Sequence, residues 1–405
     1  MKTRFYLSSL LFSMMLLLSA CQTPANNTSA EVTPESLGIS SKAILNFVEA
    51  VETNHRDELH GFVLVKNGQT AAEGWWAPYS PSHPHMMFSL SKSFTSTAIG
   101  LAQAEGLLSI YDPVMKFFPA QTPEDPTGNL KNMRIKDLLR MSTGHDQDSW
   151  GRIQDDEGQW IKNYLALPVE HKPGTHFRYN TGATFILSAI IQEVSGENLL
   201  SYLKPRLFDP LGIENPTWEK NPDGIDKGGT GLNIRTGDIA RFGQMLLQEG
   251  KWEDNQLVPC EWVMEATAVQ TSNGSNPESD WDQGYGYQFW RCKPENVYRG
   301  DGAFGQYCIV MPDQQAVLAI TSGSSNMQSV LNLVWKHLLP AMQSLPLPED
   351  TASYDKLMEK LANLTLSKVQ GVAFSDLAEQ ISGKIFRLEQ NTDSLEMIKF
   401  HLTGD

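Results

Sequence analysis

Phe88-Ser-Leu-Ser-Lys-Ser-Phe-Thr95 is the most informative segment for recognising the fold. It places the hydroxyl of Ser89 and the amine of Lys92 one helical turn apart, so both can lie on one face of a helix start and touch. A helix is predicted over residues 91–104, because apolar residues recur at helical spacing before Gly106. A serine hydroxyl becomes a nucleophile when a neighbouring amine of lowered pKa takes its proton. The stretch therefore predicts a reactive Ser–Lys pair.

The pattern Ser-x-x-Lys is weak by itself, since it begins at Ser89, Ser201 and Ser353 in this chain. Most copies of such a pair are solvated helix surface. Ser89 differs because it follows the apolar Met86-Met-Phe88 and precedes a helix of small residues that can pack inside a domain. Ser201 and Ser353 lie in ordinary amphipathic stretches.

The elements around this helix predict an α+β fold. Asn-Gly at residues 67–68 predicts a β-hairpin over residues 61–76, because this pair favours the positive φ angles of a tight turn. Residues 135–267 carry helical spacings and predict a mainly helical subdomain. Short strands are predicted at residues 285–291, 303–311 and 316–321, and a closing helix at 327–342. We expect an antiparallel sheet flanked by helices and assembled from both ends of the chain.

Further motifs follow in order: Asp137-Leu-Leu-Arg-Met-Ser-Thr-Gly-His145, Pro173-Gly-Thr-His-Phe-Arg-Tyr-Asn-Thr181, Gly229-Thr-Gly-Leu232, Asp238-Ile-Ala-Arg-Phe-Gly243 and Asp301-Gly-Ala-Phe-Gly-Gln306. With the Ser89 motif, they resemble the signatures of the class C β-lactamase-like, penicillin-binding serine hydrolase family. The variant of the last motif looks more like the family VIII esterase and 6-aminohexanoate-dimer hydrolase branch. The resemblance covers residues 38–343 and implies a β-lactamase/DD-peptidase-like fold.

The resemblance also implies roles for single residues. Ser89 would be the nucleophile, and Lys92 and Tyr179 would share and move its proton. The backbone N–H groups of Ser89 and Ala303 would form the oxyanion hole. Thr181, Gly300, Gly302 and His145 are the residues expected to contact substrate.

Two departures from the family pattern concern substrate recognition. Thr181 stands where the family has the Asn of Tyr-x-Asn, so a hydroxyl replaces an amide. Gly300-Asp-Gly302 aligns with the Lys-Thr-Gly or His-x-Gly motif, so the cation that meets a substrate carboxylate is missing. Arg299 or Arg291 could replace that charge, although each is more often a surface cation. Gly302 fits the close backbone approach expected of this strand.

The histidines raise two alternatives, a metal site and a Ser-His-Asp triad. His83 and His85 lack the following Asp-His of a metallo-β-lactamase-like site, and no Gly-x-Ser-x-Gly elbow supports a Ser-His-Asp triad. His145 either lines the cleft or has a structural role. Trp150, Tyr285 and Trp290 either line a pocket or belong to the core. We expect no metal site and no organic cofactor.

The N-terminus is typical of an exported lipoprotein. Lys2 and Arg4 precede an apolar run that closes at Leu18-Ser-Ala-Cys21, which resembles the bacterial lipobox. We expect residues 1–20 to be a signal peptide, Cys21 to be lipidated, and residues 21–37 to form a tether. An ordinary secretory signal is the alternative. Gln after the cysteine resembles outer-membrane sorting, on the periplasmic side, in Gram-negative bacteria.

Residues 344–405 are expected to be a C-terminal extension, because Leu345-Pro-Leu-Pro-Glu-Asp350 is typical of a boundary. A helix is predicted at residues 354–364 and strands at 384–388 and 395–402, which form a small addition or an incomplete β domain. Export would permit a Cys260–Cys292 disulfide, which stays open. The oligomeric state also stays open.

The formal charge of −15 argues against a nucleic-acid partner. The sequence predicts an envelope-anchored serine hydrolase that cleaves an ester or amide of a small molecule or short peptide through a Ser89 acyl-enzyme. One alternative is a DD-peptidase or weak β-lactamase acting on cell-wall peptides or β-lactams. Another is a non-catalytic lipoprotein that binds peptide or cell wall.

Overall fold

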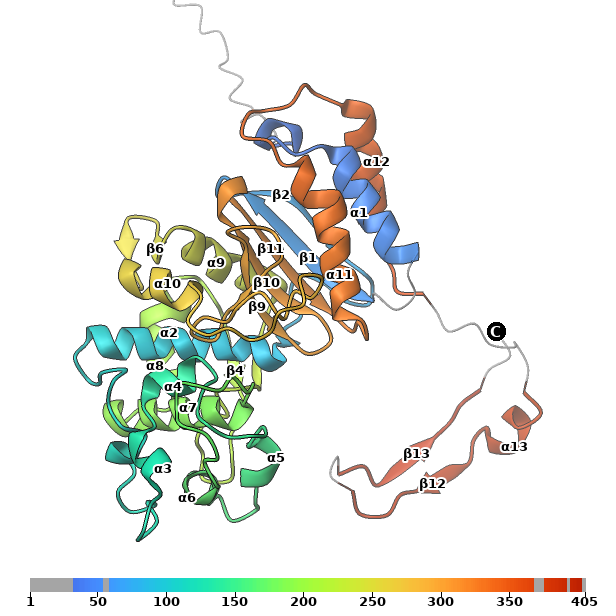
Figure 1. Ribbon diagram of the computed structural model, residues 1–405. Helices are drawn as coiled ribbons and strands as arrows, with labels where there is room; N and C mark the ends of the chain where they lie inside the picture. The colour runs from blue at the N-terminus through green and yellow to red at the C-terminus, as the bar shows by residue number, and fades with distance from the viewer. Residues whose placement is uncertain (1–31, 54–57, 368–374, 392–393, 403–405) are drawn as a thin grey trace, which may run out of the picture.

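A six-stranded antiparallel sheet forms the centre of the computed structural model, which describes residues 32–53, 58–367, 375–391 and 394–402. The strand order is β2-β1-β11-β10-β9-β8. Segments far apart in the sequence, residues 59–75 and 290–322, therefore build one sheet, as predicted (Figure 1). The strands are β1 (Leu59–Lys66), β2 (Gln69–Trp75), β8 (Trp290–Arg291), β9 (Tyr298–Gly302), β10 (Gln306–Met311) and β11 (Ala316–Ser322).

The β1–β2 hairpin is confirmed. Asn67 and Gly68 have φ angles of 50° and 76°, the left-handed conformation that the tight turn requires. The sheet is buried on both faces, and alternate residues of β1 enter different cores: Val63 packs with the helical side, and Phe62 and Leu64 pack on the opposite face.

Three helices cover one face of the sheet: α1 (Ser41–Thr53), α11 (Met327–Leu333) and α12 (Thr351–Ala362) (Figure 1). Leu357 of α12 is fully buried, and Lys360 forms an ion pair with Glu52 of α1. The helical part of the predicted C-terminal extension thus packs against the helix that precedes β1. The domain boundary at residue 343 stays a prediction, and α12, which follows it in the sequence, packs on the main body of the protein.

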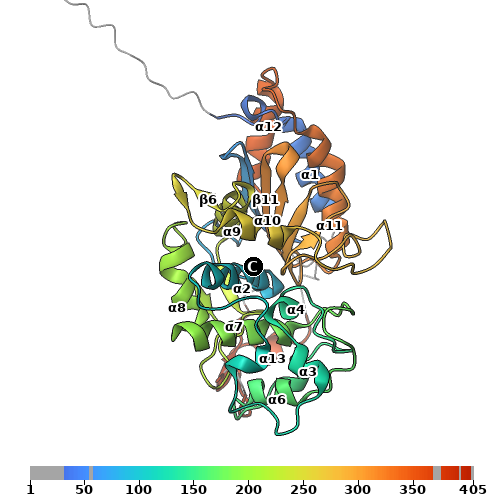
Figure 2. The same cartoon turned by 60° about the vertical axis from the view of Figure 1, so that its left-hand side comes forward.

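The other face is covered by α9 (Thr236–Leu247) and α10 (Cys260–Thr267), and a helical layer follows (Figure 2). Helix α2 (Ser91–Ala104) runs between these two helices and the helical layer, and its residues 91–102 are all buried. Gly100 is needed in α2 because a Cβ there would lie 2.4 Å from the ring of Trp262. Small residues thus let α2 pass through the centre of the molecule. The remaining helices of the layer are α3 (Gly128–Asn132), α4 (Ile135–Leu139), α5 (Trp150–Ile153), α6 (Trp160–Ala166), α7 (Thr181–Ser195) and α8 (Leu199–Leu203).

Several predicted elements are shorter than expected; the strand predicted at residues 303–311, for example, begins only at Gln306. The strand predicted at residues 285–291 is reduced to β8, because Tyr285 exchanges backbone hydrogen bonds with Thr271 instead of joining the ladder. The helix predicted at 327–342 leaves regular α geometry after Leu333, and Pro340 lies in its last turn.

The smaller elements are a three-stranded sheet in the order β3-β5-β4 and two hairpins. The predicted tail strands are confirmed as a short hairpin, β12–β13, exposed on both faces. Cys260, Cys292 and Cys308 are free, so no Cys260–Cys292 disulfide forms. None of the helices described is long and apolar enough to cross a bilayer. The bounds are β3 (His85–Met86), β4 (Thr217–Trp218), β5 (Leu232–Ile234), β6 (Lys251–Trp252), β7 (Asn255–Gln256), β12 (Ile385–Arg387), β13 (Met397–Lys399) and α13 (Ala378–Ile381).

Candidate active site

Ser89 lies in a single 3₁₀ turn, Phe88–Leu90, that leads directly into α2. The residue before this turn is held by strand β5, because the Met87 N–H donates to the Leu232 carbonyl at 2.8 Å. Phe88 adopts a φ of 46°, an uncommon conformation for a residue other than glycine. Ser89 remains partly exposed. The sequence thus folds into a strained turn that presents one hydroxyl at a helix start.

Lys92 joins the hydroxyl of Ser89 to a second loop. Its Nζ donates to Ser89 Oγ at 3.0 Å and to the Gly229 carbonyl at 2.7 Å. Gly229 belongs to the predicted Gly229-Thr-Gly motif, and a Cβ there would lie 2.8 Å from the Thr181 carbonyl. The glycine therefore lets this loop approach α7 and bring its carbonyl to the lysine.

The buried position of Lys92 changes its acid–base behaviour. The side chain is 1% exposed, and burial lowers the pKa of its amine to about 7. The carboxylates of Asp148 and Asp301 oppose this shift, because negative charge favours the ammonium form. An amine with a pKa near 7 is a competent base at neutral pH.

Tyr179 completes the cluster of Ser89, Lys92 and Tyr179, which the structure brings together as predicted from the motifs. The Ser89 side chain acts on its hydroxyl and lowers the pKa of the phenol against the effect of burial, and Lys92 Nζ lies 4.9 Å from its ring centroid. The ring stacks on Trp290 with centroids 5.3 Å apart. Burial raises the pKa of the Tyr179 phenol, so it keeps its proton. Asn180 N-caps α7 and fixes the tyrosine just before the helix.

Thr181 is held at the start of α7 by a carboxylate that the sequence did not single out. The Thr181 N–H donates to Asp148 Oδ1 at 2.8 Å, and the Trp150 N–H donates to the same oxygen at 3.0 Å. Thr181 itself is 9% exposed. Asp148 thus ties the loop before α5 to the residues that follow Tyr179.

Strand β9 passes close to the Ser89 turn. A Cβ on Gly302 would lie 2.1 Å from the Met87 carbonyl, and one on Gly300 would lie 2.5 Å from Leu90 Cδ1. Both glycines are buried, and their role is to let the strand approach; Ala303, which follows, is exposed. Close approach is what an oxyanion hole shared between Ser89 and Ala303 would require.

The two arginines considered as substitutes for the missing cation are both engaged within the protein. Arg299 is fully buried and forms an ion pair with Asp301 at 3.0 Å. It is therefore neither a surface cation nor a free partner for a substrate carboxylate. Burial raises the pKa of the Asp301 carboxyl, against the lowering effects of Arg299 and of the Trp290 side chain. Arg291 donates to the Thr267 carbonyl.

His145 does not line the site, which corrects its assignment to substrate binding. Its side chain is 0% exposed, packs against Tyr164, and shares a hydrogen bond with Thr143 Oγ1 at 2.8 Å. Burial lowers the pKa of its imidazole to about 4, so it stays neutral. His85 pairs with His60 at 2.8 Å, and His83 is exposed.

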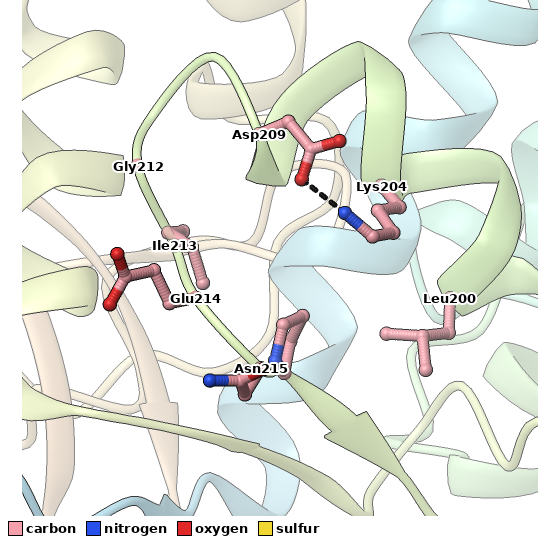
Figure 3. A pocket seen from close by; sticks show the side chains of 8 residues that line it. Leu200, Lys204, Asp209, Gly212, Ile213, Glu214 and Asn215 are labelled. Carbon is pink, nitrogen blue, oxygen red and sulfur yellow. Dashed lines mark hydrogen bonds and ion pairs between the residues drawn. The ribbon is translucent and has the colours of Figure 1, made fainter.

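The other Ser-x-x-Lys copies lack this environment. Lys204 forms an ion pair with Asp209 at the side of a surface hollow (Figure 3), and Ser201 is exposed. Ser353 lies at the start of α12, and Lys356 is exposed. Burial of the lysine therefore separates Ser89 from the two other copies.

Asp148, the Gly229 carbonyl and Trp290 are the site groups that sequence reasoning missed or left open. Asp148 lies in the segment His145-Asp-Gln-Asp-Ser-Trp150. The only sequence feature that could have pointed to it is that it follows the motif ending at His145 by three residues. The carbonyl of Gly229 carries no side-chain signal at all. Trp290 was left as pocket or core, and the structure makes it a buried platform for Tyr179.

Comparison with known proteins agrees with this arrangement. The sequence model of the Beta-lactamase family matches residues 51–333, more than half of the chain. The 6-aminohexanoate-dimer hydrolase of Paenarthrobacter ureafaciens is 26% identical over an alignment of 254 residues, and the match covers 58% of this chain and 62% of that protein. An Escherichia coli K12 protein provisionally named D-alanyl-D-alanine carboxypeptidase is 28% identical over an alignment of 225 residues, and the match covers 42% of this chain and 51% of that protein.

A solved structure supports the fold. A Bacillus anthracis protein, provisionally named 6-aminohexanoate-dimer hydrolase, superposes with a TM-score of 0.63 at 21% identity, covering 74% of this chain and 82% of that one. The curated relatives are matched over less than two thirds of their length. The match over residues 51–333, the shared fold and the ordered motifs show that the chain belongs to the Beta-lactamase family of serine hydrolases.

Proposed function

We propose that this chain hydrolyses an ester or amide of a small molecule or short peptide through an acyl-enzyme on Ser89. One observation carries the proposal: the amine of Lys92, with its pKa lowered to about 7, donates to Ser89 Oγ at 3.0 Å. A buried amine at this distance can take the serine proton at neutral pH. The lysines of the two other Ser-x-x-Lys copies, Lys204 and Lys356, are exposed.

The first half of the reaction forms the acyl-enzyme. Neutral Lys92 takes the proton of Ser89, and Ser89 Oγ bonds to the substrate carbonyl carbon. The backbone N–H groups of Ser89 and Ala303 stabilise the oxyanion. Tyr179 keeps its proton because its pKa is raised, so it can donate to the leaving alcohol or amine while Lys92 reprotonates it. The carbon–leaving-group bond then breaks.

The second half releases the acyl group. A water molecule gives one proton to the Lys92–Tyr179 pair and adds to the acyl carbon, and Ser89 Oγ leaves with a proton returned from that pair. Every proton removed is given back, so the protein groups need no cofactor for this sequence.

The β9 strand supports an ester or amide without an obligatory carboxylate. Gly300 offers no side chain where the related motif has a cation, and Arg299 is already paired with Asp301. A DD-peptidase-like or β-lactamase-like activity is the second candidate, favoured by the E. coli relative's provisional name. The substrates of these enzymes carry a carboxylate, and in this chain the motif that should supply a cation for it contains the acidic residue Asp301 instead. We therefore place it second.

We also propose that the chain is lipid-anchored at Cys21, in the bacterial envelope and on the periplasmic side of the outer membrane in a Gram-negative host. The support is the lipobox-like Leu18-Ser-Ala-Cys21, which lies outside the described residues. A Cys21→Ser variant should lose membrane association in a detergent-partition experiment. The proposed division is residues 1–20 signal, 21–37 tether, 38–343 hydrolase domain and 344–405 extension.

A substrate panel tests the proposed activity. Wild type and Ser89→Ala should be compared on p-nitrophenyl esters, an amide dimer of 6-aminohexanoate, a D-alanyl-D-alanine peptide and a chromogenic cephalosporin. Ester or amide turnover that disappears with Ser89→Ala supports the proposal. Turnover confined to the last two substrates would instead favour the DD-peptidase or β-lactamase candidate. Binding of cell-wall peptide without turnover would favour a non-catalytic lipoprotein.

A further inference from the structure

Three potential metal ligands gather on two loops near the Tyr179 segment. They are Asp146, in the loop before α5, and His171 and His176, in the loop before α7. Their ligand atoms all lie within 4.8 Å of one another. The proposed acyl transfer uses none of these side chains, and the sequence alone predicted no metal site.

Backbone hydrogen bonds hold the two loops that carry these side chains next to each other. The His171 N–H donates to the Gly144 carbonyl at 2.8 Å, and the Gly174 N–H donates to the Ser142 carbonyl at 2.7 Å. Gly144 has a φ of 94°, and a Cβ there would lie 2.3 Å from the His171 carbonyl oxygen. Close backbone contact therefore sets the distance between Asp146 and the histidines before any ligand binds.

The three side chains lie close together, and one of their ring nitrogens has no hydrogen-bond partner among the described residues. His171 Nε2 lies 2.5 Å from Asp146 Oδ1, and the rings of His171 and His176 have centroids 4.2 Å apart. His176 Nε2 is buried and has no hydrogen-bond partner among the described residues. Two neighbouring imidazoles with one unpartnered nitrogen and a carboxylate form a set of donors for a cation.

We propose that Asp146, His171 and His176 bind one divalent transition-metal ion of the Zn²⁺ class. Imidazole nitrogen favours such ions, whereas Ca²⁺ and Mg²⁺ prefer oxygen ligands alone. Glu170 adds negative charge beside the site, since its carboxylate accepts the Asp146 N–H at 3.1 Å. The Asp146 and His171 side chains are 54% and 41% exposed, which leaves room for water as a further ligand.

The geometry requires only small side-chain movements. Zn²⁺ binds nitrogen and oxygen at about 2.0–2.2 Å, so tetrahedral ligand atoms lie roughly 3.4 Å apart. His171 would bind through the nitrogen that now faces Asp146. In that arrangement the ring carries its proton on Nδ1.

Such an ion would join the loops that position the candidate active site. Asp146 is two residues before Asp148, which accepts the Thr181 N–H. His176 is three residues before Tyr179. We infer a structural role, in which the ion holds the Asp148 loop against the Tyr179 segment.

Metal titration of the untagged full chain tests the proposal. Co²⁺ should bind wild type at one equivalent with a visible d–d spectrum that Zn²⁺ displaces. His171→Gln and His176→Gln each remove a direct ligand, so each should weaken binding by at least the roughly 10- to 100-fold that loss of an outer-shell partner costs. Asp146→Asn is a third ligand variant. His83→Gln, at an exposed histidine elsewhere, is the matched control and should bind like wild type.

Circular dichroism checks that each variant is folded. Equal Co²⁺ affinity in wild type and all folded ligand variants, or no binding by wild type, would overturn the metal site. Neither result would affect Ser89 labelling, so failure of this proposal is distinguishable from failure of the proposed hydrolase activity.

Discussion

The carboxylate of Asp301 lies 3.0 Å from the guanidinium of Arg299, and both side chains are buried beside the candidate active site. Removing one member of a buried ion pair leaves the other charge without compensation. Arg299→Met should therefore lower the free energy of unfolding by about 3–5 kcal/mol, measured by urea denaturation. Lys293→Met, which removes an exposed ion pair with Glu278, should change it by less than about 1 kcal/mol. Equal losses in both variants would contradict the account.

Lys92 should set the pH dependence of Ser89 acylation. The neutral amine is the base, and burial lowers its pKa to about 7. The fraction of neutral amine rises with pH, so the rate of fluorophosphonate labelling should rise through pH 7 and level off above it. Lys92→Met should slow labelling by about 10²–10⁴-fold, whereas Lys204→Met should leave it unchanged. A rate that falls with rising pH would argue against a lysine base.

Asp148 should affect the pH at which Ser89 labelling reaches half its maximal rate. Its negative charge favours the ammonium form of Lys92, so removing the charge should lower the lysine pKa further. Asp148→Asn keeps an oxygen for the Thr181 and Trp150 N–H groups and should shift the midpoint of the labelling profile to lower pH. Asp155→Asn, on the α5–α6 connection, should not shift it. An upward shift with Asp148→Asn would mean that the charge acts in some other way.

Gly302 should be required for the approach of β9 to the Ser89 turn. An added Cβ would lie 2.1 Å from the Met87 carbonyl oxygen, so the strand would have to move away. If Ala303 supplies an oxyanion donor, Gly302→Ala should slow labelling about 10²-fold or more. Gly151→Ala is the control, because a Cβ there meets no atom within 4 Å. Unchanged labelling kinetics in Gly302→Ala would show that this close approach is dispensable.

The helix starts and the hairpin were predictable because their signals are local. Asn67 and Gly68 determine a turn wherever they occur between strands, and helix α2 follows from the spacing of its apolar residues. The Ser89, Lys92 and Tyr179 cluster needed the family resemblance, since the tyrosine is far from the other two in sequence. Burial of Lys92 depends on the packing of α2 between two layers, which spacing does not reveal.

Several motif residues that attracted attention in the sequence have structural roles. Asp137 is fully buried and accepts from Arg134 and Arg140 at the start of α4. Asp238 does the same between Arg235 and Arg241 at the start of α9. His145 is likewise internal. A motif shows that a residue matters to the fold, but only its exposure and neighbours show whether it can meet a substrate.

Ser89 should be the one acylated serine, which intact-mass spectrometry after exposure to a fluorophosphonate can show. The full chain should gain the mass of a single phosphonyl group. Ser201→Ala, which alters another Ser-x-x-Lys copy, should gain the same mass, and Ser89→Ala should gain none. An adduct that persists in folded Ser89→Ala, or no adduct in folded wild type, would contradict the account.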